Sequence, residues 1–306
     1  MPKVSVVLPS FNSEKYIGEA IDSVLTQSFS DFELIAVDSN STDRTLDIIQ
    51  AYQDKRIKII SAPFKCGEST PRNLGYMAAV GEYIVNMDSD DIMYKDRLLK
   101  QVNFLDANAD VDILGSSFTL FEGERRSKRP QPVSDGEIKA KMLIANGNAM
   151  MNPTVMLRRA FIEKNWVYYP PLMVDADHGF WIECIKNGAT FANLKDGLLD
   201  YRVHQNNMSR AHPQNKTPLR VELLGMYFSD LSCNECGKIA VTMEEGRVLS
   251  LYEAYGGIRA IDNALRISVC DFGADIKVLK SVLIHFRRLV ADAINASLKG
   301  ARASLT

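Results

Sequence analysis

Short apolar runs alternate with amphipathic stretches along the first 121 residues. The apolar runs are rich in β-branched residues and stop at proline or polar residues, which is typical of buried strands. The stretches between them carry apolar residues three and four positions apart, which predicts helices. The predicted strands cover residues 4–8, 32–37, 57–60, 83–87 and about 113–121. Strands and helices that alternate at this spacing predict βαβ units and an α/β fold with a mostly parallel sheet.

The second half of the chain is less regular. The run EGERRSKRPQP, residues 122–132, predicts a charged and solvated loop. Short strands are predicted at residues 154–157 and 198–203, and a helix is predicted to begin at Asp177. From about residue 206 onward the pattern is helical, with a long apolar stripe over residues 277–298. This stripe is consistent with packing on its own domain, on a second subunit, or on an anionic membrane surface.

Composition narrows the class of protein. With 306 residues the chain can form one large domain or two, and its net charge of −2 gives no global reason for nucleic-acid binding. No apolar run approaches the roughly 18 residues that span a bilayer, and the N-terminal run is too short for a secretory signal. The five cysteines are odd in number and scattered, which favours reduced thiols in a cytoplasmic protein. Cys233 and Cys236 form a single C-x-x-C, for which two ordinary thiols are a simpler interpretation than a zinc or redox site.

Polar side chains follow three of the predicted strands at the point where each strand ends. They occupy residues 9–12, 38–43 and 88–91. In parallel sheets, ligands bind beyond the carboxyl ends of the strands, so these segments are expected to face one crevice. Asp88 and Asp90 are alternate residues and can point toward one hard cation, Mg²⁺ or Mn²⁺. The simpler interpretation of this stretch is a solvated acidic turn before the next helix.

Four segments, in this order, carry a resemblance to a known family. They are VSVVLPSFNSEKYIGEAIDSVLTQSFSDFELIAVDSNSTDRT, GESTPRNLGYMAAVGEYIVNMDSDD, DADHGFW and YRVHQNNMS. Together they resemble a family 2 glycosyltransferase with the GT-A fold, over roughly residues 3–209. The resemblance implies a nucleotide-sugar-binding half, residues 1–121, and an acceptor and catalytic-base half, residues 122–209. A helical C-terminal region, residues 210–306, lies outside it.

The resemblance implies a nucleotide-diphosphate sugar as the donor, with UDP the first candidate and dTDP the next. Asp38 would accept a hydrogen bond from the imide N–H of uracil or thymine, and Arg72, followed by Asn73, would pair with phosphate or the base edge. The family's DxD motif falls on Asp88 and Asp90, whose carboxylates would hold the metal and contact the ribose. The residues assigned to the substrate in this way are Pro9, Phe11, Asn12, Glu14, Asp38, Gly67, Arg72, Asp88, Ser89 and Asp90.

The same resemblance assigns the reaction chemistry to the second half. Asp177 matches the family's catalytic base, which would remove the proton from an acceptor hydroxyl in a single inverting displacement. His204 matches a position near the diphosphate, on the metal in some members. Mg²⁺ or Mn²⁺ would stabilise the charge of the leaving nucleotide diphosphate as a Lewis acid. The simpler roles are a helix cap for Asp177 and a structural side chain for His204.

Four motif positions depart from the family's pattern. Phe11 replaces the usual tyrosine, Ser39 replaces a second acidic residue, Asn40 replaces a glycine, and Ala176 replaces the glutamate before the base. The loss of the carboxylate at Ser39 weakens the argument for UDP. Asp175, one residue before Ala176, offers a partial substitute for the missing glutamate.

The sequence therefore predicts an inverting, metal-dependent glycosyltransferase that acts on a glycan or lipid-linked acceptor. It is expected in the cytoplasm, with the C-terminal helices contacting the inner face of the membrane or a second copy of the chain. The alternative is a catalytically weak or inactive nucleotide-sugar-binding protein of the same fold. A nucleotidyltransferase would need a glycine-rich basic loop after the first strand, and an NAD-linked oxidoreductase would need G-x-G-x-x-G there. The sequence has PSFNSEKY instead.

Overall fold

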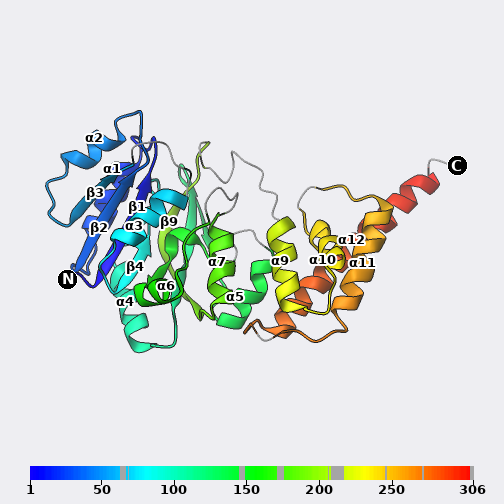
Figure 1. Cartoon of the computed structure of the whole chain (residues 1–306). Coiled ribbons are helices and arrows are strands. Elements are labelled where there is room, and N and C mark those ends of the chain that lie inside the picture. The colour runs from blue at the N-terminus through cyan, green and yellow to red at the C-terminus, as the bar shows by residue number, and fades with distance from the viewer. Residues whose placement is uncertain are drawn as a thin grey trace. The chain divides into compact units, whose positions relative to one another are not determined.

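The computed structural model describes residues 1–62, 67, 69–144, 149–170, 176–205, 207, 217–244, 247–270 and 272–303. Contacts between residues divide the chain into two compact units (Figure 1). The first unit is Met1–Ser134 with Met150–Pro213, and the second is Asp135–Ala149 with Gln214–Thr306. The functional boundary placed after residue 209 on the sequence alone stays a prediction.

One sheet runs through the first unit, with its strands in the order β3-β2-β1-β4-β8-β6-β9-β5 and β7 beside β6. β1 (Val4–Ser10), β2 (Phe32–Asp38), β3 (Ile57–Ser61) and β4 (Tyr83–Asn86) pair in parallel. The other strands are β5 (Ile92–Met93), β6 (Ile113–Glu122), β7 (Arg125–Arg129), β8 (Met156–Arg158) and β9 (Phe191–Arg202). β6 and β9 are parallel, whereas β5, β7 and β8 pair antiparallel with their neighbours. The predicted α/β class is confirmed.

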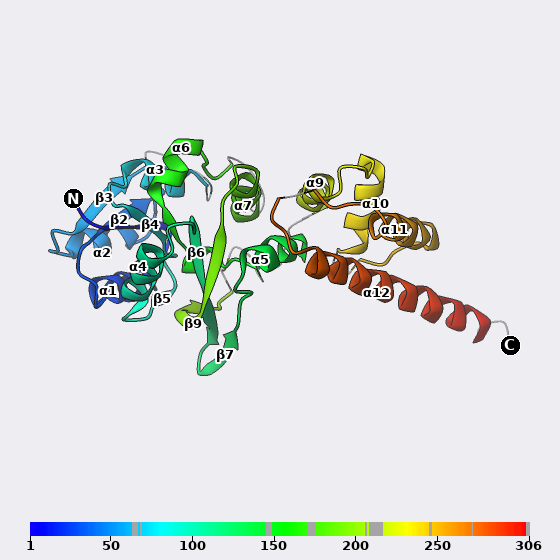
Figure 2. The ribbon, with the colours of Figure 1, turned by 90° about the horizontal axis from the view of Figure 1, so that it is seen from below.

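Helices cover both faces of the parallel part of this sheet (Figure 2). α1 (Ile17–Leu25), α2 (Thr45–Ala51) and α4 (Arg97–Ala107) share one buried apolar cluster with β1, β2 and β4. α3 (Ser69–Ala78) packs on the opposite face, where a Cβ at Gly75 would lie 2.3 Å from a methyl group of Val7. Alternate residues of β1 therefore face the two layers, since Val6 belongs to the cluster and Val7 contacts α3.

Several local predictions in the second half are wrong. Residues 125–129 are not a loop but form β7, which pairs with β6 across a turn at Gly123, whose φ is +58°. Every β7 residue is exposed, so this edge strand has no alternation of apolar and polar residues by which the sequence could predict it. β9 begins at Phe191 rather than at residue 198, because the exposed Lys195 and Asp196 interrupt its apolar pattern. The short β5 and the helix α6 (Arg159–Asn165) have no clear apolar period and were not predicted.

The second unit is helical. It contains α5 (Asp135–Lys141), α9 (Thr217–Tyr227), α10 (Cys233–Thr242), α11 (Leu251–Ala264) and α12 (Ile276–Ala303). α10 and α11 each begin with a capping box, in which Ser232 pairs with Glu235 and Ser250 pairs with Glu253. The cysteines in the described part of the chain are free thiols, and Cys66 lies outside it.

α12 buries much of its apolar stripe within its own unit. Leu279 and Leu283 are fully buried, and Val290 and Ile294 pack with Ala254 of α11. Figure 2 shows α11 and α12 side by side. This is one of the three placements that the sequence left open, and these contacts lend no support to the other two. Among the described helices, none is both long and apolar enough to cross a bilayer.

Candidate active site

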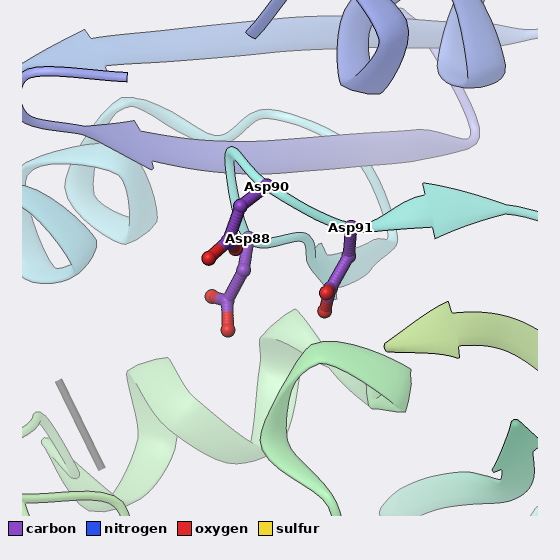
Figure 3. Close-up of side chains that lie close together, drawn as sticks. All are labelled: Asp88, Asp90 and Asp91. Atoms are coloured by element: carbon purple, nitrogen blue, oxygen red, sulfur yellow. The ribbon is translucent and has the colours of Figure 1, made fainter. Parts of the chain in front are cut away.

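Three carboxylates gather in the turn between β4 and β5, which we call the acidic turn (residues 88–91). β4 ends at Asn86, and β5 begins at Ile92. One carboxylate oxygen from each of Asp88, Asp90 and Asp91 lies within 4.8 Å of the others. Figure 3 shows the three side chains projecting on the same side of the turn. The turn follows the carboxyl end of a central parallel strand, where the sequence predicts the ligand to bind.

The carboxylates of the acidic turn repel one another. Burial and the charge of Asp88 raise the pKa of Asp90, although contact with His204 opposes the shift. Burial and the charges of Asp90 and Asp88 raise the pKa of Asp91 well above its usual range, and its Oδ2 has no hydrogen-bond partner among the described residues. A hard divalent cation would remove this repulsion, because Mg²⁺ and Mn²⁺ prefer carboxylate oxygens. The turn therefore fits the predicted metal, with Asp91 added to the candidate ligands.

His204 reaches the acidic turn from the end of β9. Its Nε2 lies 2.8 Å from Asp90 Oδ2, and Asn207 donates its side-chain amide to the same oxygen at 3.4 Å. The rings of His204 and Tyr16 are 4.9 Å apart between centroids. The predicted neighbourhood of His204 and Asp90 is thus present, and the place of His204 on the metal stays a prediction.

Arg202, which the sequence analysis missed, holds the acidic turn against β9. Its backbone N–H donates to Asp91 Oδ1 at 2.9 Å, and its Nε donates to the carbonyl oxygen of Asp90 at 2.8 Å. Its guanidinium lies 4.5 Å from the ring centroid of Tyr16 and 4.6 Å from that of Phe121. The signal in the sequence was an arginine two residues before His204, inside a segment already matched to the family.

Arg72 faces the acidic turn from α3. Its Nη2 donates to Asp88 Oδ1 at 2.6 Å, and its side chain is only 10% exposed. Burial by itself lowers the pKa of Arg72, but the charges of Asp88 and Asp177, together with the hydrogen bond to Asp88, contribute to raising that pKa well above its usual value. Within the described residues, Nη1 is buried without a hydrogen-bond partner. A buried guanidinium with an unused donor is suited to a phosphate oxygen.

The loops after β1 and β2 are joined by hydrogen bonds. Asn12, which has a φ of +48°, accepts at its side-chain oxygen from the N–H of Thr42 at 2.8 Å. Ser41 accepts from the N–H of Asn12 and donates its own N–H to Asp38 Oδ2 at 3.0 Å. Asp38 is 1% exposed, and its carboxylate accepts hydrogen bonds from Ser41, which stabilises the two loops. Its contact with a nucleotide base stays a prediction.

The remaining predicted substrate residues lie along the same edge or near it. The hydroxyl of Ser89 is 2.7 Å from that of Ser13, which joins the acidic turn to the loop after β1. Glu14 is exposed and accepts from the N–H of Arg44 at 3.0 Å. Pro9 pairs with a β2 residue within the sheet, Phe11 is half-buried and Gly67 is exposed. Contacts of these residues with a donor stay predictions.

Asp177 lies in the first turn of α7 (Ala176–Lys186). Its Oδ1 accepts a hydrogen bond from Asn152 Nδ2 at 2.9 Å. Its charge contributes to the raised pKa of Arg72, as that of Asp88 does. Asp175 lies outside the described residues. Asn152 was missed because its segment matches none of the family motifs and has no clear apolar period.

An α/β sheet that sets three carboxylates beside a buried arginine is the arrangement expected of a protein that binds a phosphate-bearing ligand together with a divalent cation. The chain belongs to the family described as "Glycosyl transferase family 2", whose sequence profile matches residues 5–166. An uncharacterized glycosyltransferase of Methanocaldococcus jannaschii is 33% identical over 223 residues, covering 70% of this chain and 76% of that relative. The poly(ribitol-phosphate) beta-N-acetylglucosaminyltransferase TarS of Staphylococcus aureus is 30% identical over 207 residues, covering 66% of this chain and 35% of TarS. The predicted family and the assignment as a glycosyltransferase are confirmed.

Solved structures share the fold of this chain. The structure of S. aureus TarS 1–349 in complex with UDP-GlcNAc matches with a TM-score of 0.66 at 22% identity, over 99% of this chain and 92% of that one. The mannosyltransferase PcManGT of Pyrobaculum calidifontis, in complex with GDP-Man and Mn²⁺, matches with a TM-score of 0.52 at 16% identity. At these identities the similarity bears on the fold, and it confirms the predicted GT-A architecture.

Proposed function

We propose that this glycosyltransferase is inverting and metal-dependent, and that it moves a sugar from a UDP-sugar, or secondly a dTDP-sugar, to a hydroxyl of a glycan or lipid-linked acceptor. The observation that carries the proposal is the position of Arg72. Its buried guanidinium donates to Asp88 of the acidic turn at 2.6 Å and lies 5.7 Å from the ring centroid of Tyr169, whose hydroxyl binds the same Asn152 side chain as Asp177 on α7. The donor and the base would therefore meet at one place. The neighbours in complex with UDP-GlcNAc, and with GDP-Man and Mn²⁺, support a nucleotide-sugar donor and a metal.

The acidic turn would hold the metal and the diphosphate end of the donor. Asp88, Asp90 and Asp91 offer carboxylate oxygens to the cation, and His204 stands against Asp90. When bound, Mg²⁺ or Mn²⁺ supplies Lewis-acid stabilisation of the departing diphosphate. Arg72 keeps Nη2 on Asp88 and has Nη1 left for a phosphate oxygen.

Asp177 would act as the general base. It takes the proton from the acceptor hydroxyl while that oxygen forms a bond to C1 of the donor sugar. The bond from C1 to the diphosphate oxygen breaks, and its electron pair leaves with the nucleotide diphosphate. Attack from the face opposite the leaving group inverts C1, so a single carboxylate base suffices.

The experiment that tests this function measures the release of nucleotide diphosphate from UDP-GlcNAc, UDP-glucose, dTDP-glucose and GDP-mannose. One uridine or thymidine donor should turn over with Mn²⁺, and the turnover should be lost with EDTA and in Asp90→Asn. The matched control Asp54→Asn changes a carboxylate paired with Arg56 outside the site and should keep full turnover. Tight binding of a donor without turnover by the wild-type protein would favour the alternative, an inactive nucleotide-sugar-binding protein. The departures at Ser39 and Ala176 motivate that alternative.

The remaining assignments rest on the sequence. We assign the acceptor to residues 122–209, and contact with a membrane surface or a second copy to residues 210–306. A cytoplasmic protein at the inner face of the membrane would pellet with anionic vesicles, and a homo-oligomer would sediment above the mass of one chain. If the protein neither pellets with the vesicles nor sediments as an oligomer, residues 210–306 contact neither a membrane surface nor a second copy.

A further inference from the structure

A chain of buried polar side chains leads from α3 and β4 to Asp177. Tyr76 donates its hydroxyl to Asn86 Oδ1 at 2.8 Å. Asn86 in turn donates its amide to Asn152 Oδ1 at 2.7 Å, and Tyr169 donates its hydroxyl to the same oxygen at 2.8 Å. Asn152 then donates its amide to Asp177 Oδ1 at 2.9 Å. The other four members of this network, Tyr76, Asn86, Asn152 and Tyr169, are at most 4% exposed, so water does not compete for these bonds.

The orientation of the Asn152 amide is fixed by its partners. Its Oδ1 accepts two hydrogen bonds, so its Nδ2 is the end that meets Asp177. The reverse orientation would set the amide oxygen against a carboxylate and the NH₂ group against the donating amide of Asn86. Burial raises the pKa of both Tyr76 and Tyr169, so both phenols remain protonated and able to donate. The chain of hydrogen bonds therefore runs in one direction and ends on the carboxylate.

Tyr169 is held firmly in this arrangement. Its ring stacks on that of Phe180 with centroids 4.2 Å apart and an interplanar angle of 4°. Asn73 donates its amide to the carbonyl of Tyr169 and accepts from its N–H, both at 2.9 Å. Asn73 follows Arg72 on α3. The same helix therefore contacts Asp88 through Arg72 and holds Tyr169, the hydrogen-bond partner of Asn152, through Asn73.

We propose that Asn152 is a positioning residue for sugar transfer, which holds the carboxylate of Asp177 ionised and in register with the acidic turn. The proposal rests on the proposed function, in which Asp177 is the base. The positive charge of Arg72 already favours the ionised form of Asp177, and the hydrogen bond donated by Asn152 favours that form further. A base accepts a proton only in this charged form. Asn86 links the two places, because it binds Asn152 and is the last residue of β4, two residues before Asp88 of the acidic turn.

The first test follows the ionisation of Asp177 without any substrate. In protein labelled with ¹³C at the aspartate carboxyls, the resonance of Asp177 is identified by its loss in Asp177→Asn. Its titration midpoint should rise by about one pH unit in Asn152→Ala, because a hydrogen bond to a charged group is lost. Tyr169→Phe keeps the ring and should give a smaller shift in the same direction. Asn193→Ala removes a buried amide that donates to the carbonyl of Pro132 at 2.7 Å and should give none.

The second test follows the reaction. With the donor that turns over, the acidic limb of the pH profile of kcat/KM should move up with the NMR midpoint in Asn152→Ala, while the Kd for UDP stays within about twofold. An unmoved midpoint overturns the proposal, and so does a moved midpoint with an unmoved acidic limb. Full turnover by Asp177→Asn would instead contradict the proposed function, and the substrate-free titration separates the two failures.

Discussion

Replacing Arg72 with methionine should move the affinities for the metal and for UDP in opposite directions. Methionine keeps an apolar stem but removes the cation that contacts Asp88 at 2.6 Å. The acidic turn then gains one net negative charge, so Mn²⁺ alone should bind more tightly. A unit charge ~6 Å from a divalent ion contributes roughly 5–6 kcal/mol at an effective dielectric constant of about 20. Because the two side chains are 10% and 25% exposed, screening by solvent leaves about 1–2 kcal/mol, or a gain of about five- to thirtyfold.

UDP should bind more weakly to the same variant. A hydrogen bond from a charged donor is worth about 1.5–3 kcal/mol, which predicts a loss of about 10- to 150-fold in affinity. Calorimetric titration with Mn²⁺, and then with UDP in saturating Mn²⁺, measures both effects. The control Arg56→Met breaks an ion pair with Asp54 of 2.7 Å outside the site and should change neither affinity. Unchanged UDP affinity in a folded Arg72→Met protein, or weaker Mn²⁺ binding, would refute the reasoning.

Three further predictions test the base, the packing and the response to acid. Asp177→Asn should lower turnover by about 10²–10⁴-fold while UDP affinity stays within about twofold, and an equal loss of binding in calorimetry would contradict the assigned role. Gly75→Ala places a Cβ 2.3 Å from Val7 and should lower the free energy of unfolding by about 1–3 kcal/mol, so an unchanged thermal midpoint would count against the helix–sheet contact. Burial opposes the ionisation of Glu33, but its hydrogen bonds with Lys58, Ser5 and the Val80 N–H together outweigh burial and lower the pKa of Glu33. The stabilisation by Glu33 is therefore present above its unfolded pKa of about 4.3 and is lost as the pH falls through its lower folded pKa. In urea unfolding, Glu33→Gln should lower the free energy of unfolding at pH 7 and should have no such effect at a pH below the folded pKa.

The parallel half of the sheet was predictable from the sequence, because each of its strands has a clear local pattern of apolar residues. β1, β2, β3 and β4 are short β-branched runs, and the structure extends or trims each by one or two residues. β7 was not predictable in this way, since all of its residues are exposed and pairing with β6 alone makes it a strand. The start of β9 was missed because one strand crosses from buried to exposed positions and back.

The residues of the candidate site also differ in how far the sequence alone could predict them. Asp88, Asp90, Arg72, Asp177 and His204 lie in segments that match a family, so the sequence alone could name them. Asn152 and Tyr169 lie outside these segments. Asn86 and Arg202 lie inside them but were not named, because they act through contacts with residues distant in the chain. An asparagine within the buried run YIVN was a signal for a polar partner at Asn86, but nothing local identified Asn152 as that partner. Polar networks of this kind are read only from tertiary structure.

The most direct test of a metal-dependent donor site at the acidic turn is calorimetric titration with UDP, with and without Mn²⁺, of the wild-type protein and of Asp90→Ala. We predict binding to the wild-type protein that requires Mn²⁺ and is lost in the variant, because Asp90 is one of the carboxylates available to the cation. UDP binding of equal strength in all four titrations would contradict this assignment. So would the failure of the folded wild-type protein to bind UDP, dTDP, GDP or CDP with Mn²⁺.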